Sequence, residues 1–160
     1  MIKEEGVKVV VYTGYGDGSL KPALFDELKA AGITIIYRDI NPTPENSRRA
    51  EQADGDFVAT GFDEGGTLPG TALGTFTIVP LIVDAVQRVP VMAAGGITDA
   101  RGARAVHALG AEGVFSSSVF VSAPSKAGFP TRWKQKLAAN GLDLRLFRPC
   151  RTTTARCPAN

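Results

Sequence analysis

Apolar runs typical of β-strands alternate with amphipathic stretches typical of helices along this chain of 160 residues, and this alternation limits the possible folds more than any other feature. The strand candidates are residues 7–12, 33–37, 56–60, 89–93 and 113–115. The helix candidates between them are residues 22–31, 44–52, 76–87 and 99–109. Such alternation predicts an α/β fold built on parallel strands.

The ends of these helices carry start and stop signals. Pro22 and Pro44 stand at first-turn positions, where the missing proline N–H costs nothing. Gly32 and Gly110 stand where a left-handed residue ends a helix. The strand candidates are apolar almost throughout, as in residues 9–11, which predicts strands covered on both faces.

Five strands fit an open doubly wound sheet, whereas a (β/α)8 barrel needs three more. One motif favours the open sheet, because a glycine loop at residues 14–18 follows the first strand and Asp39 ends the second, as in a dinucleotide-binding unit. Ser19 replaces the third glycine of that motif, and Pro22 delays the helix. The motif is therefore incomplete.

Two loops of small residues predict an anion site. Gly95 and Gly96 follow the strand at 89–93, and a helix then opens through Thr98 and Asp99, so that backbone N–H groups are expected to face outward at a positive helix N-terminus. The last strand candidate runs into the serines at 116–118. Neighbouring strands that end in such residues can together hold one phosphate.

Four blocks of residues follow one another between about residues 32 and 120. They are Gly61, Asp63, Gly65 and Gly66 with Thr67; the helix start at residues 75–80; Ala93 to Ile97; and Ser117, Ser118, Val119 and Phe120. In their type and order these blocks resemble the C-terminal half of the nitronate monooxygenase (2-nitropropane dioxygenase) family, which includes similar FMN-dependent enoyl-reductases.

The resemblance implies an α/β fold of parallel β/α units, a partial TIM (β/α)8 barrel in which about five strands are the fourth to the eighth. It implies an FMN-dependent oxidoreductase that oxidises nitronates or nitroalkanes. The implied phosphate contacts are Gly95, Gly96, Ser117 and Ser118, and the implied backbone close to the flavin is that of Gly66 and Ala94.

The implied catalytic position holds Thr67 where the family has its histidine base. A threonine hydroxyl is no base near neutral pH, but it can donate a hydrogen bond to a substrate oxygen or a flavin carbonyl. Asp63 and Glu64 are the nearest carboxylates that could replace the base. The catalytic candidates are therefore Thr67 and Asp63.

Two alternatives remain open at this stage. The same phosphate loops suit a flavin-free barrel enzyme, a lyase or isomerase, that binds a phosphate ester. The second alternative is a catalytically inactive fragment, since three barrel strands would be missing unless another chain supplies them. The expected organisation is a partial FMN-binding barrel at residues 1–125 and a basic helix with an irregular tail at 126–160.

Composition and charge limit the kinds of ligand and partner that we expect for this chain. The net charge of +2 conceals a basic end, because residues 126–160 hold eight basic side chains and only one acidic residue, Asp143. No nucleic-acid motif accompanies it, and Cys150, Cys157 and His107 are too few for a usual zinc site. His107 is expected on an exposed helix face. We expect a cytoplasmic protein with a small nitronate-like substrate, no metal, no nucleic acid, no membrane contact and possible homo-oligomers.

Overall fold

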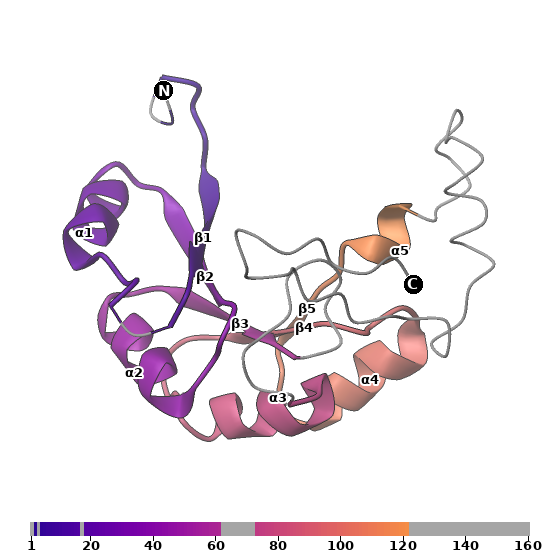
Figure 1. Ribbon diagram of the computed structural model, residues 1–160. Helices are drawn as coiled ribbons and strands as arrows, with labels where there is room; N and C mark the ends of the chain where they lie inside the picture. Colours follow the sequence, from indigo (N-terminus) through magenta and orange to yellow (C-terminus); the bar gives the residue numbers. More distant parts are fainter. Residues whose placement is uncertain (1, 3, 17, 62–72, 122–160) are drawn as a thin grey trace, which may run out of the picture. The chain divides into compact units, whose positions relative to one another are not determined.

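A computed structural model describes residues 2, 4–16, 18–61 and 73–121 (Figure 1). The chain divides into two units, residues 1–121 and 122–160, and the second unit lies outside the described residues. The strands of the first unit are β1 (Val9–Gly14), β2 (Thr34–Asp39), β3 (Asp56–Thr60), β4 (Val91–Ala94) and β5 (Gly113–Phe115). Its helices are α1 (Pro22–Ala30), α2 (Pro44–Gln52), α3 (Thr75–Val83), α4 (Ala100–Ala108) and α5 (Ser118–Val121). The predicted helix and tail at 126–160 stay a prediction.

The strands form one parallel sheet in the order β1-β2-β3-β4-β5. A doubly wound sheet reverses its strand order at a switch point, and this sheet has no reversal. Right-handed crossovers that always step in the same direction place every helix on the same face. Figure 1 shows α1 to α4 along one side of the curved sheet. The architecture is that of a partial TIM barrel, as the sequence predicted.

The helix signals of the sequence act where they were expected. Pro22 and Pro44 lie in the first turns of α1 and α2. Gly32 and Gly110 follow the helix ends with φ angles of +69° and +97°. The helix boundaries are therefore fixed by local chemistry that a single sequence displays.

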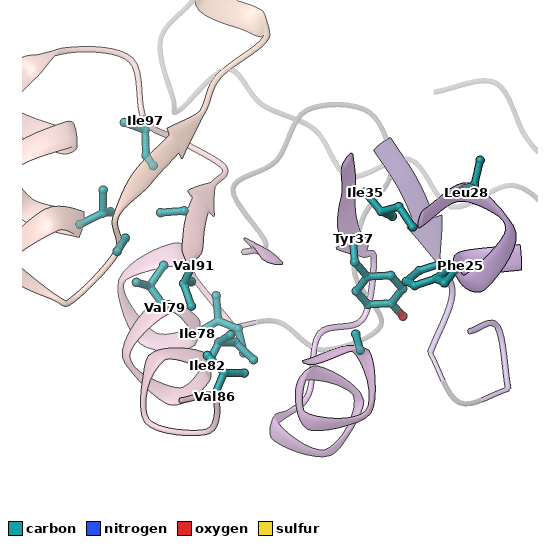
Figure 2. Packing of buried hydrophobic residues seen from close by; sticks show 14 of the residues in the cluster. Phe25, Leu28, Ile35, Tyr37, Ile78, Val79, Ile82, Val86, Val91 and Ile97 are labelled. Carbon is teal, nitrogen blue, oxygen red and sulfur yellow. The ribbon is translucent and has the colours of Figure 1, made fainter. Parts of the chain in front are cut away.

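The hydrophobic core lies between the sheet and the helices (Figure 2). Phe25 of α1 packs edge-on against Tyr12, with ring centroids 5.1 Å apart, and is 6.3 Å from the Tyr37 ring of β2. Ile78 and Ile82 of α3 are almost fully buried. This packing holds the helix-facing side of each strand and so fixes the positions of the strand ends.

The opposite face of β1 differs from the expectation. Val9 and Val11 are 51% and 47% exposed, whereas Val10 and Tyr12, which point to the helix side, pack against the core. The prediction that strands are covered on both faces is therefore wrong for β1 within the described residues. Side chains alternate between faces, and in a barrel the inner face is covered by strands across the lumen rather than by helices.

Candidate anion-binding site

The two loops singled out in the sequence lie side by side at the carboxyl edge of the sheet. Ala94, the last residue of β4, is the parallel partner of Phe115, the last residue of β5. Gly95 and Gly96 follow β4 in the chain, and Ser116 and Ser117 follow β5. The structure thus brings together the loops that were predicted to share one anion.

The β4–α4 loop has a backbone shape that requires glycine. Gly95 and Gly96 have φ angles of +102° and +66°, a region that residues with a Cβ rarely adopt. Ile97 then returns to the core and is only 8% exposed. The two glycines therefore form a tight turn whose far end is anchored by a buried side chain.

Protein donors hold the carbonyl oxygens of this loop. The Thr75 hydroxyl lies 3.2 Å from the Ala94 oxygen and 2.9 Å from the Gly95 oxygen. The Gly61 N–H also donates to the Ala94 oxygen, at 3.2 Å. The Ser116 hydroxyl donates to the Ile97 oxygen at 3.2 Å. The loop is thus tied to the starts of two neighbouring loops.

The N–H groups of Gly95 and Gly96 have no protein acceptor within the part of the chain that the structure describes. Backbone N–H donors without a protein acceptor in a glycine loop are a donor set suited to a phosphate group. Ser117 is exposed, and its carbonyl accepts the N–H of Phe120 at 3.0 Å. Ser118 is the first residue of α5. The residues present therefore fit a phosphate.

The start of α4 departs from the expectation. Asp99 caps this helix and accepts the N–H groups of Arg101 at 2.9 Å and Gly102 at 3.1 Å. The Arg101 side chain, followed by these N–H groups, lowers the pKa of Asp99 to about 2. First-turn N–H groups of α4 are thus already used by a carboxylate. On this side of the candidate site, the backbone donors without a protein acceptor are the N–H groups of Gly95 and Gly96 among the described residues.

Asp39 is not placed to bind a ribose, which removes the dinucleotide interpretation. It is 3% exposed and accepts the N–H groups of Gly16 (3.1 Å) and Asn41 (2.9 Å) and the amide of Asn46 (3.1 Å). The Tyr37 hydroxyl also donates to it, at 3.3 Å. Asp39 therefore ties the loops after β1 and β2 together, a network that the sequence analysis missed.

The other residues singled out in the sequence lie away from the glycine loop or outside the described part of the chain. Asp63, Glu64, Gly66 and Thr67 lie outside the described residues, so their roles stay predictions. His107 is exposed on α4, as expected, and its Nδ1 lies 2.7 Å from the Ala111 oxygen.

Within residues 4–16, 18–61 and 73–121, no three histidine, cysteine or acidic side chains gather as metal ligands. None of the helices described there is long and apolar enough to cross a membrane.

Consecutive parallel strands with a glycine loop at their carboxyl edge define a protein of the β/α-barrel class. The family model for nitronate monooxygenase matches residues 1–160, and the chain belongs to this family. A Bacillus subtilis (strain 168) relative named "Probable nitronate monooxygenase" is 34% identical over 128 residues, which are 75% of this chain and 36% of the relative.

Solved structures agree with this assignment. A FabK (M276A) mutant from Thermotoga maritima superposes with a TM-score of 0.73 and 32% identity, over 86% of this chain and 44% of that chain. A nitroalkane oxidase from Streptomyces ansochromogenes has a TM-score of 0.64 and 27% identity, over 76% and 36% of the two chains. The chain therefore spans less than half the length of these proteins.

Proposed function

We propose that this chain forms the phosphate-binding part of an FMN-dependent oxidoreductase of the nitronate monooxygenase type, acting on small nitronates or nitroalkanes. The observation that carries the proposal is the pair Gly95 and Gly96, with unpaired N–H groups among the described residues, at the end of β4 beside the end of β5. The common phosphate site of β/α barrels follows their last two strands. Family membership supplies the reaction class.

The chain's own residues would bind and orient the cofactor. Gly95, Gly96, Ser117 and Ser118 would hold the FMN phosphate, and the backbone of Ala94, which is 3% exposed, would lie close to the flavin. A bound flavin supplies hydride or electron transfer. The loop ties from Thr75 and Ser116 keep the donors in place before the cofactor arrives.

Thr67 limits which substrates we propose, because a threonine cannot take a proton from carbon as the family's histidine would. A hydroxyl there would donate a hydrogen bond to a substrate or flavin oxygen, and Asp63 would be the candidate base for a substrate that must lose a proton from carbon. Substrates already present as nitronate anions need no such base. Nitronates are therefore the first substrates to test, before neutral nitroalkanes.

The test is retention of FMN by the purified chain, measured by visible absorbance after free ligand is removed. Gly96→Ala should weaken FMN binding, because its φ of +66° resists a side chain at the loop. Gly32→Ala is the matched control: its φ is +69°, an added Cβ there meets nothing within 4 Å, and it lies at the far end of α1. The control should bind FMN as the unaltered chain does.

The other outcomes separate the alternatives. Retention of a sugar phosphate without flavin would favour a lyase or isomerase on the same loops. A cooperatively folded chain that retains neither ligand would contradict the proposal. It would favour the alternative of a catalytically inactive fragment, which does not bind the cofactor on its own. If FMN is retained, oxygen consumption with nitronates, with and without NAD(P)H, tests the reaction, and gel filtration tests whether the chain forms homo-oligomers.

A further inference from the structure

The hydroxyl of Thr75 lies at the junction of three elements beneath the glycine loop. Thr75 is the first residue of α3, is 1% exposed, and approaches the carbonyl oxygens of Ala94 and Gly95 at 3.2 and 2.9 Å. A hydroxyl has a single hydrogen to donate. The shorter distance places that hydrogen mainly on the Gly95 oxygen.

The two carbonyls differ in how much they depend on Thr75. The Ala94 oxygen also accepts the Gly61 N–H, so it keeps a donor when the hydroxyl is removed. For the Gly95 oxygen, Thr75 is the donor seen among the described residues. Loss of the hydroxyl therefore acts chiefly on the peptide that joins Gly95 to Gly96.

The direction of that peptide decides where the Gly96 N–H points. In a trans peptide the C=O of one residue and the N–H of the next point in opposite directions, and the described residues contain no cis peptide. A Gly95 carbonyl held toward buried Thr75 turns the Gly96 N–H away from the protein interior. Glycines rotate freely, so without the tie this peptide has other orientations to adopt.

We propose that Thr75 is a positioning residue for recognition of a phosphate monoester: its hydroxyl holds the Gly95–Gly96 peptide so that the Gly96 N–H faces the ligand phosphate. The inference rests on the proposed function for the identity of the ligand, FMN. In this proposal the Thr75 hydroxyl acts through the Gly95–Gly96 peptide, whose carbonyl it contacts, and not by contact with the ligand.

The decisive comparison uses FMN and riboflavin, which differ only in the phosphate. Thr75→Val keeps the shape of the side chain and removes the hydroxyl, and we expect about a tenfold loss of FMN affinity with riboflavin affinity unchanged. Thr75→Ser restores the hydroxyl and should restore FMN binding. Thr77→Val, an exposed threonine of the same helix, is the matched control and should change neither affinity.

A second measurement tests the hydrogen bond from Thr75 to the Gly95 oxygen without any ligand. In the free chain, the backbone order parameter of the Gly96 amide, measured by NMR, should fall from about 0.85 toward 0.6 in Thr75→Val and remain high in Thr75→Ser and Thr77→Val. A melting temperature recorded for each variant identifies general destabilisation. A drop confined to the loop supports the proposal.

The outcomes distinguish the two proposals. If the unaltered chain binds neither FMN nor riboflavin, the proposed function fails, while the Gly96 order parameter still decides the role of Thr75. If Thr75→Val leaves both the FMN-to-riboflavin ratio and the order parameter unchanged, the positioning role is overturned. Equal loss of both affinities with a lower melting temperature also overturns it, because a merely structural threonine behaves in that way.

Discussion

The Glu51 carboxylate accepts the backbone N–H of Arg88 at 2.6 Å, and the same oxygen accepts the N–H of Gln87 at 2.7 Å. The contact joins the last turn of α2 to the segment that leads into β4, and Glu51 is only 9% exposed. Because β4 ends in the glycine loop, this carboxylate helps to set the position of the strand that carries the site.

Replacing Glu51 with glutamine should therefore destabilise the fold. Hydrogen bonds to a charged acceptor are lost or weakened, and we expect the free energy of unfolding to fall by about 1–2 kcal/mol. Urea denaturation at pH 7 measures this change. Glu45→Gln is the matched control on the same helix, since the ion pairs described for Glu45, with Arg48 and Arg49, are exposed. Equal effects of the two substitutions would show that the buried contact contributes nothing.

The same contact makes stability depend on pH. The N–H groups of Gln87 and Arg88 hold the pKa of Glu51 below its ordinary value of 4.5. A carboxyl whose pKa is lowered in the folded state stabilises it fully above the ordinary value, and this contribution is lost as the pH falls through the folded pKa. The stability difference between Glu51→Gln and the unaltered chain should accordingly shrink from pH 7 to pH 3.

Alanine substitutions at Gly61 and Gly102 should have opposite effects on the free energy of unfolding. A Cβ on Gly61 would lie 2.6 Å from the Thr75 Cα, so backbone must move, and we expect a loss of about 1–3 kcal/mol. A Cβ on Gly102 would meet the Ile97 Cγ2 at 3.4 Å, and inside α4 alanine should stabilise by about 0.5–1 kcal/mol. Thermal unfolding of both variants measures these changes, and a harmless Gly61→Ala would contradict the close approach of the β3 end and α3.

Asp99 should contribute to stability through its capping geometry and, at low pH, through its charge. Asp99→Ala removes the acceptor of the Arg101 and Gly102 N–H groups and should lower the free energy of unfolding, while Asp99→Asn keeps an acceptor and should lose less. The pKa of Asp99 is lowered from 3.8 to about 2, so its charge contributes fully above 3.8 and is lost between 3.8 and 2. Denaturation between pH 5 and pH 2 should show this loss, and Asp99→Asn should not.

Element types could be predicted from this sequence more reliably than element ends. The strand at 56–60 matches β3 (Asp56–Thr60), because turn residues bound it on both sides. The predicted helix at 76–87 overruns α3 (Thr75–Val83), since the apolar pattern continues to Val86, which is buried beyond the end of the helix. Apolar periodicity reports burial, and burial does not stop where helical hydrogen bonds stop.

The candidate site could be predicted in part. Loops that end adjacent parallel strands meet at one edge, so the placing of Gly95 and Gly96 beside Ser117 follows from strand order alone. The tie from Thr75 could not be predicted, because it joins residues 20 positions apart through the three-dimensional approach of α3 to β4. The cap at Asp99 was missed, because the helix was expected to begin at residue 99 with its first-turn N–H groups open to an anion, whereas the aspartate side chain accepts two of them.

The buried pair Tyr37 and Asp39 gives a prediction at alkaline pH. Burial first, and then the negative charge of Asp39, raise the pKa of Tyr37 to about 12. Asp39→Asn should lower this pKa while leaving it above 10, since burial, the larger cause, remains. Asp26→Asn, an exposed carboxyl on α1, is the matched control and should leave the pKa of Tyr37 unchanged.

NMR of the chain labelled with ¹³C-tyrosine follows the titration of each of the three tyrosine hydroxyls separately. Because the pKa is raised in the folded state, the stabilising contribution of protonated Tyr37 is complete below about 10 and is lost as the pH rises to about 12. The unaltered chain should therefore lose stability over this interval, and Asp39→Asn should show a smaller change. A Tyr37 signal that titrates near 10 in the folded unaltered chain would contradict the buried pairing, and with it the network that joins the loops after β1 and β2.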